Sequence, residues 1–169
     1  PWIGGAMESG WSVNPHWVAD LSIIKDHDIG NGVPEKVICL DEWYYNMRFV
    51  EDREKVLDLF TAVPTRKNMH RYINMWNKNG VEGLEKQQTL MWGYERPEGG
   101  RGVGFVGGHY HHSWAVDGLR KAVLNAIVWT AGMKVPEEGV LSKSPTEEEL
   151  NVNLDKKGRV KRIKIPDPA

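Results

Sequence analysis

The amino-acid sequence predicts a mixed α/β fold built around one hydrophobic core. Thr89 to Glu95 and Arg101 to Val106 flank a turn that contains Pro97 and two glycines, which predicts a β-hairpin. A helix is predicted to begin at Asp117 and to end before Gly132, because apolar residues recur between them at helical spacing. The chain has 169 residues, 40% of them hydrophobic, which is enough for one sizeable core.

The first half of the chain predicts less regular structure. Residues 1–34 are rich in Gly, Pro, Asn and Trp and predict a loop, with a short helix around Pro15 to Asp20. Glu35 to Leu40 is a brief β-like run, and Lys55 to Val63 is a second one that a proline ends. The polar segment Thr65 to Lys86 predicts a short amphipathic helix, because four apolar residues follow helical spacing. These residues are Met69, Tyr72, Ile73 and Trp76.

The C-terminal region predicts an extension of the main domain. Ser144-Pro145-Thr146-Glu147 resembles a capping box with Pro at the first helical position, which predicts a short helix. Asp155 to Ile165 alternates charged and apolar residues and predicts an edge strand or a solvated tail without a role in chemistry. We therefore divide the chain into a domain over residues 1–140 and an extension over residues 141–169.

The charge balance gives no general attraction to nucleic acid or to an anionic membrane. Lys and Arg number 22, Asp and Glu number 23, and the formal net charge is −1. No apolar run approaches the roughly 20 residues needed to span a bilayer. The single cysteine, Cys39, lies in an apolar run, which predicts a buried position. The chain begins at Pro1 with neither an initiator Met nor a signal-peptide pattern, so we expect a cut end there.

The stretch Gly104 to Trp114 is the first candidate site. An apolar strand runs through Gly107 and Gly108 into three histidines, of which His109 and His111 share one side if the extended conformation persists. Imidazole changes charge near neutral pH, so such a cluster can bind a metal, transfer a proton or anchor a polyhydroxylated ligand. The alternative is a glycine turn with half-exposed structural histidines.

The acidic pair Asp41 and Glu42 is the second candidate, because it ends an apolar strand and precedes Trp43 and Tyr44. A carboxylate can hold an imidazole in one tautomer, and aromatic neighbours exclude water from such a pair. The alternative is a buried carboxylate that ties down backbone N–H groups of a loop, which suits Asp41 better than Glu42.

Asn14 and His16 form the third candidate, because an amide and an imidazole lie between indoles. Short polar groups among aromatic rings suit carbohydrate recognition, whereas the alternative is a capped turn in which Asn14 precedes Pro15 and His16 is exposed. The chain has eight tryptophans, and indole faces suit stacking on sugar rings as well as core packing. Trp43 and Trp114 are the two that we assign to a sugar pocket.

Several familiar site motifs are absent from the sequence. It contains no phosphate-binding loop with Lys-Ser/Thr, no G-x-S-x-G elbow, no paired C-x-x-C and no H-E-x-x-H. The glycines between Gly99 and Gly104 precede a predicted strand and not a helix, so a dinucleotide loop is excluded by context.

Four segments resemble the trehalose-utilisation (ThuA-like) family in content, order and spacing, and the resemblance covers roughly residues 1 to 140. The branch to which they are most similar is common in bacteria that degrade complex polysaccharides. The four segments are Asp26 to Val33, Asp41 to Tyr44, Gly102 to His109 and Leu124 to Trp129.

The resemblance implies a fold similar to class I glutamine amidotransferases, a flavodoxin-like three-layer sandwich with a parallel sheet between helices. Family domains begin with further β-α units before the element that is Gly4-Gly5 here, so the resemblance implies an N-terminally incomplete domain. The missing half would come from a second chain or have been removed, and a homo-oligomer is a related expectation. His109 looks like the positional counterpart of the amidotransferase histidine, with His111 near the place of its acidic partner. Cys39 does not match the nucleophile of those enzymes.

The function that the resemblance implies is the binding or transformation of a saccharide, keto-sugars included, in the bacterial cytoplasm or periplasm. The alternative is a non-catalytic sugar-binding or scaffold module with an amidotransferase-like fold. A divalent metal on His109 with a carboxylate such as Glu42 would also suit keto-sugar chemistry. The residues assigned to chemistry are His109, His111, Glu42 and Asp41. The residues assigned to the sugar pocket are Trp114, Trp43, His16, Tyr44 and Asn14.

Overall fold

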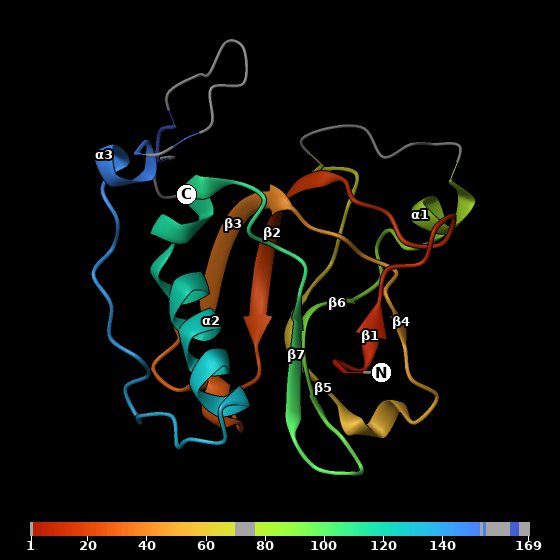
Figure 1. The fold of residues 1–169 in the computed structure, drawn as a ribbon. Coiled ribbons are helices and arrows are strands. Elements are labelled where there is room, and N and C mark those ends of the chain that lie inside the picture. The colour runs from red at the N-terminus through yellow and green to blue at the C-terminus, as the bar shows by residue number, and fades with distance from the viewer. Residues whose placement is uncertain (1, 70–76, 153, 155–162, 166–169) are drawn as a thin grey trace.

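The computed structural model describes residues 2–69, 77–152, 154 and 163–165, and its centre is a curled sheet of five strands. The spatial order of the strands is β3-β2-β5-β6-β7, and each neighbouring pair is antiparallel (Figure 1). The strands are β2 (His16–Ile23), β3 (Lys36–Glu42), β5 (Val56–Ala62), β6 (Gln88–Glu95) and β7 (Arg101–Phe105). The chain is therefore a mixed α/β fold, as its sequence predicts.

The flavodoxin-like sandwich is not what these residues form. A parallel neighbour requires a long crossover, usually through a helix. Here residues 24–35, between β2 and β3, contain only the 3-10 turn η1 (Asp28–Gly30), and β3 returns antiparallel beside β2. The connection between β6 and β7 is a hairpin, as expected. The parallel sheet expected from the resemblance is thus wrong for the described strands.

Strand β2 replaces the loop and short helix predicted around Pro15 to Asp20. Its buried side chains alternate with exposed ones, since Trp17, Ala19 and Leu21 are 0%, 0% and 1% exposed. That period of two fits a strand with one buried face. The strand pairs with β3 along its length, which places His16 opposite Glu42.

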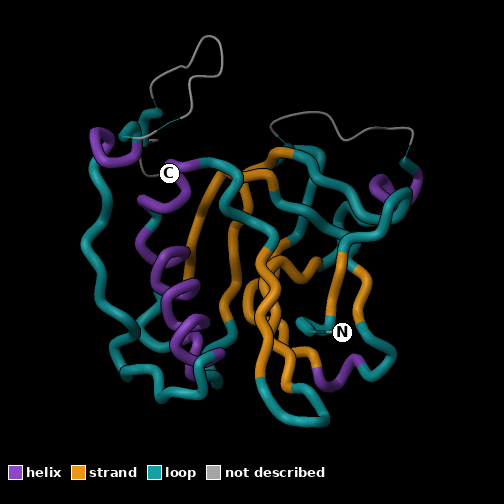
Figure 2. Tube along the Cα trace, in the orientation of Figure 1, coloured by secondary structure: helices purple, strands orange, loops and turns teal. Residues whose placement is uncertain are grey.

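Helix α2 (Asp117–Thr130) covers one face of the sheet and confirms the predicted helix (Figure 2). A side chain added at Gly93 of β6 would contact the indole of Trp129, so α2 packs directly on the sheet there. The opposite face carries a short ribbon of β1 (Gly5–Ala6) and β4 (Arg48–Phe49). Beneath this ribbon lies a second, smaller apolar cluster of Val56, Trp92 and Tyr94.

Residues 131–146 form a strap that runs back along the outer side of α2 (Figure 2). The fully buried Asn125 fastens the strap to the η1 loop. Its Nδ2 donates to the carbonyl oxygens of Ile29 and Asn31, both at 2.9 Å, and its Oδ1 accepts from the backbone N–H of Val140 at 2.8 Å. The strap thereby leads the chain back toward the end of the sheet at which β3 finishes.

Two predicted helices differ from the structure in position. α3 (Glu147–Leu150) is closed by a capping box between Thr146 and Glu149, two residues later than the Ser144 box that the sequence predicts. Within the segment Thr65 to Lys86 the structure has α1 (Lys78–Glu82), capped by Asn77, which contains none of the four apolar residues that predicted a helix there; of those four, Met69 forms a β-bridge with Trp17. Tyr72, Ile73, Trp76 and most of the predicted tail lie outside the described residues.

Candidate functional site

A close contact between the His109 imidazole and the Glu42 carboxylate marks the candidate site. Nδ1 of His109 lies 2.7 Å from Oε2 of Glu42, and the two side chains are 49% and 13% exposed. Nδ2 of Asn14 donates to the other carboxylate oxygen of Glu42 at 2.7 Å. Three residues far apart in the sequence, each assigned to the site from the sequence, therefore meet at one point.

Asp41 has a different position from its neighbour, because successive residues of a strand point to opposite faces. Its side chain is fully buried. Oδ2 accepts from the backbone N–H of Gly108 at 2.8 Å, and Oδ1 accepts from those of His109 at 3.0 Å and Tyr110 at 3.3 Å. Oδ1 also accepts from the N–H of Glu42 at 2.7 Å. Asp41 thus holds the loop that carries His109 and does not face a ligand, which corrects its assignment to the chemistry itself.

The two glycines before His109 let this loop lie close to the core. Gly108 has φ of 90°, a conformation that favours glycine. A methyl group at Gly107 would lie 2.3 Å from Cζ3 of Trp43, so the backbone can rest on the indole only because no side chain intervenes. The glycine pair and Asp41 together fix where the imidazole of His109 emerges.

His16 and Tyr110 border the pair. The Tyr110 hydroxyl lies 2.6 Å from Nδ1 of His16. The ring of His16 meets that of His109 edge to face, with 5.3 Å between centroids and an interplanar angle of 87°. The register of β2 against β3 explains this proximity, because it sets His16 opposite Glu42.

His111 does not join the site. Strand β7 ends at Phe105, Gly108 has a positive φ, and a 3-10 turn, η3 (His111–Ala115), begins with His111. Its side chain is exposed, and Nδ1 lies 3.3 Å from the carbonyl oxygen of Leu150 in α3. The prediction that His109 and His111 share one side is therefore wrong.

Of the two tryptophans assigned to the sugar pocket, Trp43 belongs to the core. Trp43 is fully buried, and its indole N–H donates to the carbonyl oxygen of Cys39 at 3.0 Å, so it offers no face to a ligand. Trp114 is half-buried beside Phe105 and behind Gly108. Tyr44, in contrast, lines the cavity next to the site, as its assignment requires.

A cavity of about 450 Å³ opens beside the His109–Glu42 pair. Its wall includes residues that the sequence did not single out, because they have no chemical signature and come from distant segments. Only the ribbon of β1 and β4, and its packing on β6 and β7, brings them together. They are Ile3, Ala6, Met7, Met47 and Trp92.

Metal and thiol chemistry find little support in these side chains. In the parts of the chain that the structure describes, no three His, Cys, Asp or Glu side chains gather to hold a metal ion. Both carboxylate oxygens of Glu42 are already engaged by Asn14 and His109. Cys39 is 3% exposed, as expected, and burial raises the pKa of its thiol to about 11, which disfavours the nucleophilic thiolate.

Comparisons with protein-family models, with curated proteins and with solved structures find no match to this chain. Among the described residues, no helix has both the length and the apolar character needed to cross a membrane. The site must therefore be interpreted from its own geometry.

Proposed function

We propose that this chain is a ThuA-like protein of carbohydrate metabolism that binds a saccharide beside His109 and transfers a proton to or from it. The observation that carries the proposal is the 2.7 Å contact between Nδ1 of His109 and Oε2 of Glu42 at the wall of the cavity. The imidazole is the acid–base group, and Glu42 is the residue that orients it.

The chemistry follows from which ring nitrogen the carboxylate engages. When Nδ1–H donates to Glu42, the neutral ring carries its lone pair on Nε2. Among the contacts of the described residues, Nε2 of His109 has no hydrogen-bond partner, so it is available to a ligand. Nε2 can then accept a proton from a sugar hydroxyl or from a carbon next to a keto group. The resulting imidazolium is stabilised by the Glu42 carboxylate and returns its proton to the product.

The cavity fits a saccharide in size and in chemical character. Its volume lies within the range of roughly 300–1,000 Å³ found for small-molecule sites. The imidazole, the carboxylate and the Tyr44 ring lie on its wall, and such groups suit hydroxyls and the apolar faces of sugar rings. Glutamine hydrolysis is not proposed, because Cys39 is buried in the core. The amidotransferase-like layering implied by the resemblance would require parallel strands beyond those described here.

The test is a comparison of saccharide binding and proton exchange in wild type and single variants. A panel of mono- and disaccharides, trehalose included, and their keto derivatives is screened by intrinsic tryptophan fluorescence. Turnover is followed by ¹H NMR in D₂O as loss of the proton next to the keto group. We expect His109→Gln to lower the exchange rate by about 100-fold or more and Glu42→Gln by about tenfold.

His111→Gln is the matched control, because it makes the same change two positions away, outside the site. It should leave binding and exchange unchanged. A wild type that binds saccharides without any exchange, with only affinity altered by His109→Gln, would favour the non-catalytic binding module. A wild type that binds no saccharide of the panel would overturn the proposal.

A further inference from the structure

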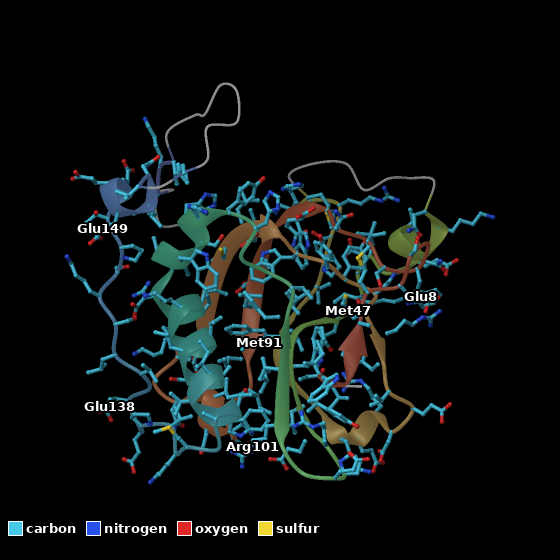
Figure 3. All side chains as sticks on the ribbon, viewed as in Figure 1. Glu8, Met47, Met91, Arg101, Glu138 and Glu149 are labelled. Atoms are coloured by element: carbon cyan, nitrogen blue, oxygen red, sulfur yellow. The ribbon has the colours of Figure 1, made fainter. Side chains whose placement is uncertain are left out.

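The wall of the cavity carries two chemically different sets of side chains. The polar set is Glu42, His109 and Tyr44. The apolar set comes from the N-terminal segment and from the residues just before β4, with Met47 on the opposite side of the sheet from α2 (Figure 3). One ligand that fills the cavity therefore has to satisfy both sets.

Two side chains of the apolar set are exposed to solvent. Ile3 is 38% exposed and Met7 is 51% exposed, and both line the cavity. Trp92 adds only apolar surface, because its indole N–H donates to the carbonyl oxygen of Ile3 at 2.7 Å. Water gains few hydrogen bonds from such a wall, whereas an apolar group placed against it would remove apolar area from water.

We infer that the ligand is a glycoside with an apolar aglycone, an inference that rests on the proposed function. The sugar ring lies at His109 and Glu42, and the aglycone lies against Ile3, Met7 and Met47. Methionine side chains are flexible and polarizable, so they adapt to aglycones of different shape. An unsubstituted polar oligosaccharide would instead leave this wall in contact with hydroxyls that it cannot bond.

The experiment compares glycosides that differ only in the aglycone. Dissociation constants are measured by calorimetry for the methyl, phenyl and hexyl glycosides of glucose, galactose, mannose and xylose, below micelle-forming concentrations. We expect the phenyl and hexyl glycosides of at least one sugar to bind about tenfold or more tightly than its methyl glycoside, because more apolar area is buried.

Variants of the wall test whether the higher affinity of the hexyl glycosides comes from the apolar side chains. Met7→Ser should reduce the hexyl-to-methyl affinity ratio to within about threefold, because it removes apolar area against which the hexyl group lies. Met47→Ser should lower the ratio in the same way. Because Met7 is 51% exposed, Met7→Ser should fold normally and gives a readout even if Met47→Ser fails to fold. Met133→Ser is the matched control, since Met133 is 63% exposed and lies outside the cavity.

The outcomes separate this inference from the proposed function. Equal affinity for methyl and hexyl glycosides would overturn the inference and leave the proposed function standing. Hexanol binding as tightly as the hexyl glycosides, unaffected by His109→Gln, would also overturn it, because the apolar wall would then act independently of the sugar site. Failure of every glycoside to bind would overturn both.

Discussion

Asp41 and Glu42 are adjacent acidic residues at the end of one strand, yet they occupy opposite environments. Asp41 is fully buried and accepts hydrogen bonds only from backbone N–H groups. Glu42 is partly exposed at the cavity and contacts two side chains, those of Asn14 and His109. The buried carboxylate fixes the loop and the exposed one orients the imidazole, so two identical charges have separate roles.

The loop from Gly107 to His109 likewise has a buried side and an exposed side. Gly107 rests on the buried Trp43, whereas His109, two residues later, is exposed beside the cavity. The buried side is expected to govern stability, and the exposed side is expected to govern ligand chemistry. Substitutions on the two sides should therefore separate the two properties.

The largest effect is expected from Asp41→Ala. It leaves the N–H groups of Gly108, His109 and Tyr110 without the buried carboxylate that accepts from them, so the free energy of unfolding should fall by roughly 3 kcal/mol. Glu42→Gln is the matched substitution at the cavity and should cost less, because it keeps an oxygen that accepts from Asn14 and gives up only the contact with the half-exposed imidazole of His109. Urea denaturation followed by tryptophan fluorescence measures both. Equal losses in the two variants would show that the division between the carboxylates is false.

A second, smaller effect is expected from Gly107→Ala. The added methyl group would overlap the indole of Trp43 and the ring of Phe105, and overpacking of this kind costs about 2 kcal/mol. Because the loop must lift away from the core, the His109–Glu42 contact should also loosen, so ligand affinity should fall with stability. Denaturation and ligand titration of the same sample check this. Full stability would mean that the loop does not depend on contact with Trp43.

The smallest expected effect is on the pH dependence of stability, and it concerns His27, a histidine outside the site. Burial lowers the pKa of His27 from 6.5, and its Nδ1 accepts from the N–H of Ile29 at 3.2 Å. Because the unfolded chain binds this proton more readily, the contribution of His27 to stability is complete above about pH 6.5. It is lost as the pH falls through the lowered value.

His27→Asn keeps a capping acceptor without a titrating group. Its stability should therefore fall less than that of wild type between about pH 7.5 and about pH 5, and urea midpoints across this range measure the difference. The pH dependence that persists in the variant belongs to other groups. A slope identical to that of wild type would exclude His27 as a contributor.

Local patterns predicted the elements that depend on local chemistry. The hairpin of β6 and β7 and helix α2 are confirmed, because turn residues and helical spacing act over a few positions. Strand β2 was missed, since Pro15 and nearby polar residues favour a turn until pairing with β3 decides the conformation. Tertiary pairing thus overrides local preference in this segment.

The polar residues that meet at the site were predictable, but the walls of the cavity were not. An acidic pair at the end of an apolar strand and an imidazole after a glycine pair predicted His109 with Glu42 or Asp41 as its partner, and the structure gives Glu42. Trp43 could not be told from a ligand-stacking residue, since an indole suits a core as well as a pocket. The apolar residues of the cavity, such as Met7 and Met47, are brought there only by the ribbon of β1 and β4.

Asn125 has a consequence for how the molecule opens. The buried side-chain amide of Asn125 forms hydrogen bonds to Ile29 and Asn31 of the η1 loop and to Val140 of the strap. Release of the strap alone would strand that amide oxygen in the interior, so the two segments should unfold as a single cooperative unit. In native-state hydrogen exchange, the amide proton of Val140 should therefore follow the same denaturant dependence as those of the η1 loop.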